Sequence, residues 1–134
     1  MINFAEILNA NPIGVFATQD GDKVKTRVFQ YLFADGKKAY FSTNSEKPVF
    51  AQMQANPNVS FCTYPQNFDP VLSISGKAVF VAEDSALKAR AFDVNPKLKG
   101  MYKSVDNPVF RIFYIEVEEV TTFSFAEGPK SYKM

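Results

Sequence analysis

The chain lacks histidine and tryptophan and has a single cysteine among its 134 residues. Without histidine, a Ser-His-Asp triad, a Cys-His pair and a histidine general base are all excluded. One cysteine allows no intrachain disulfide, and a zinc site built from cysteine and histidine is excluded as well. Cys62 alternates with bulky residues in VSFCTY, a pattern typical of a buried, inert thiol. If the protein is an enzyme, its chemistry is therefore expected to come from a cofactor.

A strong charge of one sign and long apolar runs are also missing. The net charge is +1, which gives no indication of nucleic acid or an anionic membrane as a partner. No apolar run approaches the ~20 residues of a transmembrane helix. The start, MINFAEILNANP, contains Glu6 but no Lys or Arg, unlike a secretory signal. We therefore expect a soluble, cytoplasmic protein, and the 46% hydrophobic content fits a single domain, residues 1–134, with a real core.

Hydrophobic periodicity and turn signals predict an α+β fold. Asn3, with Glu6 three residues later, is expected to cap an opening helix, and Gly76 is expected to mark a bulge or barrel corner. Helices are predicted over residues 2–10, 48–54 and 84–92, and a further short helix or turn is predicted over 97–103. Strands are predicted over residues 13–18, 24–33, 39–42, 58–64, 71–82, 110–117 and 120–125, with a turn-like tail at 127–130. These elements indicate a six- to seven-stranded antiparallel split β-barrel with short flanking helices.

The most informative stretch is FSTNSEKPVFAQM, from Phe41 to Met53. It predicts the end of a strand, a polar turn, and the first turns of a helix that opens at Pro48. A helix N-terminus presents free N–H groups and the positive end of the helix dipole. The turn adds further polar groups and a cation. Together these residues form a candidate phosphate-binding site: Ser42, Thr43, Asn44, Ser45 and Lys47. The alternative interpretation is an ordinary helix capped by Ser45.

A second cation is predicted nearby. Alternation along residues 24–33 puts Arg27 on one face together with Phe29, Tyr31 and Phe33. If this strand forms a simple hairpin with residues 39–42, Arg27 lies close to the polar turn. The alternative is that Arg27 is a solvated strand residue.

The ordered set of motifs is similar to a known family. A helix ending in NP is followed by GVFATQDGDKVKTRVF, GKKAYFSTNSEKPVFAQMQANPNVSF and LSISGKAVFV. This order resembles the pyridoxamine 5'-phosphate oxidase-like, FMN-binding split β-barrels, and the ending FRIFYIEVEEVTTFSFAEGP resembles their NimC/NimA-like bacterial subgroup. The resemblance implies a homodimer with FMN at the subunit interface and no metal. It implies that partner residues near Phe125 and Gly128 close the site, and it implies these cofactor-binding residues: Arg27, Val28, Phe29, Gln30, Ser42, Thr43, Asn44, Ser45 and Lys47.

The chain also departs from the family pattern. True oxidases carry a C-terminal Arg and His that bind substrate, and nitroimidazole-resistance members are associated with a His, whereas this chain has none. The favoured interpretation is an FMN-dependent oxidoreductase of unknown substrate, with a small-molecule electron donor and acceptor. Two alternatives stay open. One is a non-catalytic flavin-binding or redox-sensing protein, and the other is a related barrel that binds a deazaflavin, or haem through Tyr or Cys.

Overall fold

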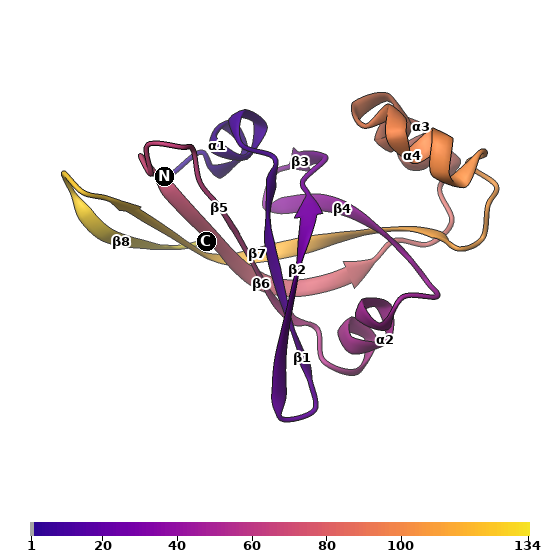
Figure 1. Cartoon of the computed structure of the whole chain (residues 1–134), viewed down its shortest axis with the longest axis horizontal. Coiled ribbons are helices and arrows are strands. Elements are labelled where there is room, and N and C mark those ends of the chain that lie inside the picture. The colour runs from indigo at the N-terminus through magenta and orange to yellow at the C-terminus, as the bar shows by residue number, and fades with distance from the viewer. Residues whose placement is uncertain (1) are drawn as a thin grey trace.

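A computed structural model describes residues 2–134 as a strongly curved sheet with four helices around it (Figure 1). The helices are α1 (Phe4–Ala10), α2 (Pro48–Ala55), α3 (Ser85–Val94) and α4 (Pro96–Tyr102). The strands are β1 (Ile13–Asp20), β2 (Lys23–Gln30), β3 (Phe33–Asp35), β4 (Lys38–Asn44), β5 (Asn58–Thr63), β6 (Val71–Phe80), β7 (Phe110–Ser124) and β8 (Gly128–Lys133). None of the helices in this part of the chain is long and apolar enough to cross a membrane.

The sheet is antiparallel and curls without closing. Its strand order is β2-β1-β5-β6-β7-β4-β3, with β8 paired to β7 beside this path. The two edge strands, β2 and β3, follow each other in the chain, so the sheet must curl to bring its edges together. The two linking residues bridge the edges, because Tyr31 N donates to Pro12 O at 2.7 Å and Leu32 N donates to Tyr40 O at 2.9 Å. This is the expected split barrel, with eight strands in place of six or seven.

The predicted hairpin between residues 24–33 and 39–42 is wrong in one respect. The stretch breaks at Tyr31 and Leu32, so that β2 pairs only with β1 and the short β3 pairs with β4. Arg27 therefore lies opposite Phe16 of β1, and not opposite the polar stretch that begins at Ser42. The Asp35-Gly36 turn does exist, with Gly36 at φ +59°, but it joins only β3 to β4.

Aromatic side chains fill the barrel interior and a second core beneath α3 and α4. Phe41 packs against Phe113 inside the barrel, with ring centroids 5.7 Å apart. Phe92 stacks on Phe110 in the second core, at 5.0 Å. The aromatic residues 29, 31 and 33, which alternation places on one face of the predicted strand with Arg27, do not form an exposed face. Phe29 is half-buried, and Tyr31 and Phe33 are buried.

Local signals were the most reliable. Asn3 caps α1 by accepting from Glu6 N, and the register between β6 and β7 shifts at Ser75/Gly76 as a bulge there requires. Besides the break at Tyr31 and small shifts of other ends, three element limits differ from expectation. β4 continues through Asn44, β7 is one unbroken strand of 15 residues, and the tail at 127–130 leads into β8. The tail becomes a strand because it pairs with the C-terminal half of β7.

Candidate cofactor site

A pocket of about 150 Å³ lies where the C-terminal ends of β2 and β4 approach α4. It brings together six of the nine site residues predicted from the sequence. From the β2 side come Val28, Phe29 and Gln30, and from the end of β4 and the loop after it come Ser42, Thr43 and Lys47. The two segments meet although β2 and β4 are not neighbours in the sheet, because the curl of the barrel brings its open edges together. Asn44, Ser45 and Arg27 do not line the pocket.

The polar stretch after Phe41 is mostly strand and not turn. Ser42, Thr43 and Asn44 complete β4, and the turn is closed by Asn44, whose Oδ1 accepts from Glu46 N at 2.8 Å. The alternative interpretation, a helix capped by Ser45, is wrong, because Lys47 is the N-cap residue of α2 and its side chain makes no capping hydrogen bond. Ser45 N instead donates to Val109 O at 2.9 Å. The N-terminal N–H groups of α2 thus have no side-chain acceptor from their own cap.

The burial and hydrogen bonding of Thr43 indicate whether an oxyanion fits in the pocket. Its side chain is 4% exposed, and its Oγ1 has no hydrogen-bond partner. A buried hydroxyl without a partner costs roughly 1–3 kcal/mol, and buried polar groups are usually satisfied. Because Thr43 lines the pocket, an oxygen atom of a bound phosphate is a suitable partner for this hydroxyl. The other unpartnered buried hydroxyl of residues 2–134, that of Tyr31, belongs to the barrel core and not to the pocket lining.

Two cations lie along α2 without a carboxylate partner in the described structure. Lys47 is exposed at the start of the helix and joins no ion pair within residues 2–134. The Arg27 side chain extends from β2 to α2, where its Nη2 donates to Gln52 Oε1 at 2.9 Å. Gln52 follows Lys47 by about one and a half helical turns. At 1.5 Å of rise per residue, the backbone positions of Lys47 and Gln52 are about 8 Å apart along the helix. Burial lowers the pKa of Arg27 from its ordinary value, although the group remains a cation near neutral pH.

Helix α4 forms a wall of the pocket that sequence reasoning missed. The residues that it and its N-cap contribute are Asn95, Leu98, Met101 and Tyr102. Asn95 Nδ2 donates weakly to Gln30 Oε1 at 3.4 Å and so joins this wall to β2. Burial raises the pKa of the Tyr102 hydroxyl, and a hydrogen bond with Asn44 acts in the opposite direction. No local signal marks these residues, which stand about fifty or more positions beyond Ser42 in the sequence.

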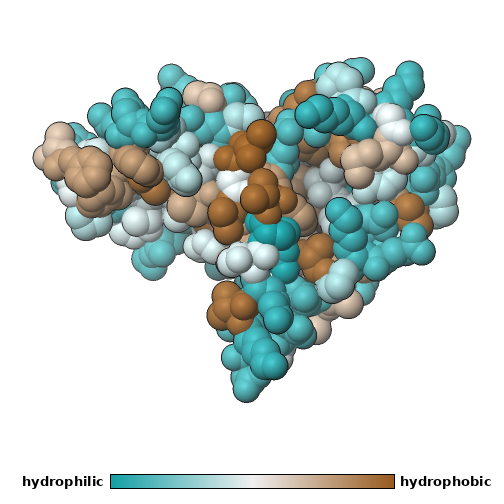
Figure 2. Space-filling model, in the orientation of Figure 1, coloured by the Kyte–Doolittle hydropathy of each residue, from teal (hydrophilic) through white to brown (hydrophobic). Residues whose placement is uncertain are grey.

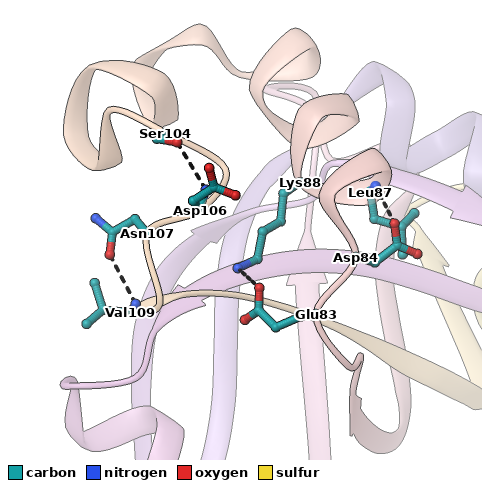
Figure 3. A network of polar contacts seen from close by, with 8 residues as sticks. All are labelled: Glu83, Asp84, Leu87, Lys88, Ser104, Asp106, Asn107 and Val109. Carbon is teal, nitrogen blue, oxygen red and sulfur yellow. Dashed lines mark hydrogen bonds and ion pairs between the residues drawn. The ribbon is translucent and has the colours of Figure 1, made fainter.

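Short polar contacts fix the segment that carries this wall (Figure 3). Lys88 is 2% exposed, and its Nζ lies 2.8 Å from Glu83 Oε2 at the base of α3. The Lys88 interaction lowers the pKa of the Glu83 carboxyl. Asp84 Oδ1 caps α3 by accepting from Leu87 N at 3.1 Å. Beyond α4, Ser104 Oγ accepts from Asp106 N and Asn107 Oδ1 accepts from Val109 N, both at 3.1 Å. The segment that comprises α3 and α4 is thereby anchored at both ends.

An apolar patch covers the outer face of the β1–β2 hairpin. Figure 2 shows it as separate brown side chains over the middle of the molecule. The exposed fractions are 61% for Ile13, 42% for Val15, 69% for Val24 and 67% for Val28. Val15 pairs directly with Val28, which also lines the pocket, so the patch runs to the pocket mouth. Phe125, 80% exposed, and Gly128 lie at the β7–β8 turn and do not line this pocket.

Comparison with solved structures identifies similar folds. A NimC/NimA family protein from Clostridium acetobutylicum is 28% identical with a TM-score of 0.84, over 96% of this chain and 88% of that one. General stress protein 26 from Bacillus anthracis is 20% identical with a TM-score of 0.80, over 96% and 94%. A heme binding protein from Mycobacterium smegmatis is 16% identical with a TM-score of 0.79, over 99% and 59%. No protein with a curated description matches the chain in sequence.

The family described as pyridoxamine 5'-phosphate oxidase matches residues 2–124 of the 134 in the chain. This range includes every strand except β8, together with all four helices and all the residues of the pocket. The split barrel, the polar end of β4 and the sequence match agree, and the chain belongs to the pyridoxamine 5'-phosphate oxidase family.

Proposed function

We propose that this protein binds FMN and acts as an FMN-dependent oxidoreductase. The observation that carries the proposal is the pocket that joins β2 to the end of β4 and contains the unpartnered Thr43 hydroxyl. In this proposal the phosphate is held by Ser42, Thr43, Asn44, Ser45, Lys47 and Arg27. The flavin ring lies along Val28, Phe29 and Gln30. When bound, FMN supplies hydride or electron transfer.

The chain's own residues would orient the cofactor. Thr43 can donate a hydrogen bond to a phosphate oxygen, and Lys47 adds a positive charge at the start of α2. The free N–H groups of the first turn of α2 are a further favourable element for a dianion. On the ring side, Phe29 is fixed in the barrel by Phe16, with centroids 4.9 Å apart, so its backbone presents a rigid edge. In this proposal these contacts bind and orient the cofactor, and the redox reaction takes place at the flavin ring.

The size of the pocket favours a site completed by a second chain. Sites for drug-sized ligands are typically about 300–1,000 Å³, and the pocket here is about 150 Å³. One chain therefore encloses only part of an FMN molecule. The apolar patch that includes Val28 offers a surface beside the pocket mouth on which a partner chain can pack. In our proposal the partner's Phe125 and Gly128 region closes the flavin site.

We expect a homodimer in solution, and we expect Val28→Glu to weaken it. The substitution places a charge in the centre of the patch, where dimer formation would bury it without a partner. Light scattering on the purified protein measures the effect, with Lys23→Gln at an exposed position of the same strand as the control for the same change in net charge. A wild-type protein that is monomeric and still holds FMN would contradict the interfacial site.

We expect no useful oxidation of pyridoxine phosphate. A phosphorylated pyridine needs a cationic clamp of its own, and the tail offers Lys130 and Lys133. Lys130 Nζ lies 3.3 Å from Glu127 Oε2, and Lys133 Nζ lies 3.1 Å from Glu119 Oε2, so both charges are already paired. Steady-state assays should give no turnover, and a rate of roughly 1 per second or more would show that the substrate site had been overlooked.

Two measurements distinguish the proposed function from its alternatives. The absorption spectrum of the purified protein separates a flavin from a deazaflavin or haem, the latter being a ligand that one structural neighbour is described as binding. Anaerobic reduction of the bound flavin by NADH or NADPH, followed by a screen of electron acceptors, then separates an oxidoreductase from a non-catalytic flavin-binding protein. Reduction by neither nucleotide, and by no other small-molecule donor, would contradict the enzymatic part of the proposal.

A further inference from the structure

The two terminal nitrogens of the Arg27 guanidinium are held by the neutral side chains of Thr18 and Gln52. Its Nη1 donates to Thr18 Oγ1 at 2.8 Å and to Phe16 O at 3.1 Å, and its Nη2 donates to Gln52 Oε1 at 2.9 Å. Thr18 Oγ1 also donates to Gln52 Oε1 at 2.6 Å. Thr18 is 1% exposed, so this arrangement lies between β1 and α2 and not on the open surface. Three elements of the fold, β1, β2 and α2, thus converge on one guanidinium.

The positions of Thr18 and Gln52 indicate which N–H groups of the Arg27 guanidinium already have acceptors. The five N–H donors of arginine form a planar fork with a fixed direction for each hydrogen. Because Thr18 and Gln52 touch each other, they share the end-on edge between Nη1 and Nη2. Nη1 also donates to Phe16 O, with a longer contact to Lys25 O at 3.4 Å. No hydrogen bond within residues 2–134 uses Nε, so the side edge formed by Nε and the second hydrogen on Nη2 is free.

A free side edge is suited to an oxyanion. Two parallel N–H groups match two oxygen atoms of a carboxylate or a phosphate, and such bidentate contacts are stronger than ordinary hydrogen bonds. The existing contacts of Arg27 are all to neutral oxygens, so its charge is not compensated by them. An ordered guanidinium also loses less side-chain entropy when a ligand binds than a mobile one does. Arg27 is followed in β2 by Val28 and Phe29, which line the candidate pocket.

We infer that Thr18 and Gln52 are positioning residues, which hold Arg27 by its end-on edge and leave the Nε–Nη2 edge ready for one phosphate monoester. The identity of the ligand, FMN, rests on the function proposed above. The positioning itself rests on the contacts among these side chains. Neither Thr18 nor Gln52 is required to touch the ligand in order to affect its affinity.

The test compares FMN with riboflavin, which lacks the phosphate, in titrations of the full chain followed by flavin fluorescence. Gln52→Glu places a carboxylate against Arg27 and partly neutralises it, and should weaken FMN about tenfold or more relative to riboflavin. Gln52→Leu removes one acceptor and should weaken FMN about 2- to 12-fold. The matched control is Gln54→Glu, which adds the same charge at an exposed position of the same helix. Thr18→Val should resemble Gln52→Leu, whereas Thr18→Ser keeps the hydroxyl and should restore the preference.

A second measurement works without flavin. In the cofactor-free protein, the Arg27 Nε–H signal in ¹H–¹⁵N NMR spectra, assigned by its loss in Arg27→Lys, should shift on addition of inorganic phosphate. The shift should need a higher phosphate concentration in Gln52→Leu. If the wild type binds neither flavin, the proposed function fails, and this phosphate shift alone decides the inference. Equal FMN preferences in Gln52→Glu and Gln54→Glu, or a phosphate titration unchanged by Gln52→Leu, would overturn the positioning role and leave the proposed function intact.

Discussion

Replacing Arg27 with alanine is expected to weaken FMN binding by roughly 10- to 150-fold and to leave riboflavin binding nearly unchanged. Hydrogen bonds to a charged group contribute about 1.5–3 kcal/mol each, and each 1.4 kcal/mol corresponds to about a factor of ten in affinity. Riboflavin lacks the phosphate and therefore does not use this contact. Lys47→Ala should act in the same direction with a smaller loss, because Lys47 is exposed and offers no bidentate fork. Fluorescence titration of both flavins against each variant gives the result.

Two controls make this comparison specific. Lys25→Ala removes one positive charge from the same strand, two residues away and at an exposed position, and should leave both affinities almost unchanged. Arg27→Lys keeps the charge and loses the fork, and should recover only part of the loss. Because Arg27 also joins β1 to α2, the melting temperature of each variant needs to be measured as well. An equal loss of FMN and riboflavin would place the effect in folding and contradict a phosphate contact.

Replacing Gly76 with alanine is expected to cause a larger loss of stability than the same substitution at any other glycine of the chain. A Cβ at this position would stand 1.9 Å from Glu116 O and 2.9 Å from its carbonyl carbon. Both atoms belong to the backbone of β7, so relief requires β6 and β7 to separate at the bulge between Ser75 and Gly76. Overpacking of this kind costs about 3 kcal/mol or more, which lowers the melting temperature by roughly 10 °C in a domain of this size. Thermal and denaturant unfolding measure the change.

Gly100→Ala is the matched control for this substitution. Gly100 lies inside α4, and a Cβ there would meet no atom within 4 Å. Alanine in a helix is favoured over glycine, so this variant should be stabilised by about 0.4–1 kcal/mol. If Gly76→Ala proves as harmless as Gly100→Ala, the close approach of β6 to β7 is not as the structure describes it.

Local features of this fold can be predicted from the sequence, because their physical cause is local. The cap at Asn3 depends on residues three apart, and the inward face of β5, with Val59, Phe61 and Thr63, follows from alternation alone. The bulge at Gly76 was indicated by a glycine inside a strand pattern. In each case the decisive atoms belong to a few consecutive residues.

Apart from the Ser45 cap, the main errors concern partners that are distant in the sequence. The stretch from 24 to 33 reads as one strand, but tertiary structure breaks it at Tyr31, whose N–H pairs with Pro12 O across the open edge. Strand β8 has weak strand character of its own and forms by pairing with β7. The pocket residues on α4 could not be found for the same reason. Tyr102 reaches the end of β4 because Asn44 pairs with Phe110 at the start of β7, and the Tyr102 ring packs on Phe110.

The candidate site likewise combines a local feature that the sequence indicates with distant contacts that it does not. Ser42, Thr43 and Lys47 of the predicted polar segment line one pocket, yet the reason given for the site, a hairpin that places Arg27 beside Ser42, was wrong. The curl of the barrel brings Val28, Phe29 and Gln30 to that segment instead. Arg27 is directed toward Thr18 and Gln52, a contact across three elements that no spacing in the sequence indicates.

Identification of the cofactor tests most directly whether the pocket between β2, β4 and α4 binds FMN. The purified protein is denatured, the released small molecule is analysed by absorption spectrum and mass, and the emptied protein is titrated with FMN. Our account predicts a flavin spectrum, the mass of FMN and saturation near one FMN per chain, with Thr43→Val reducing the affinity. A released haem or deazaflavin, or an emptied protein that does not take up FMN, would contradict it.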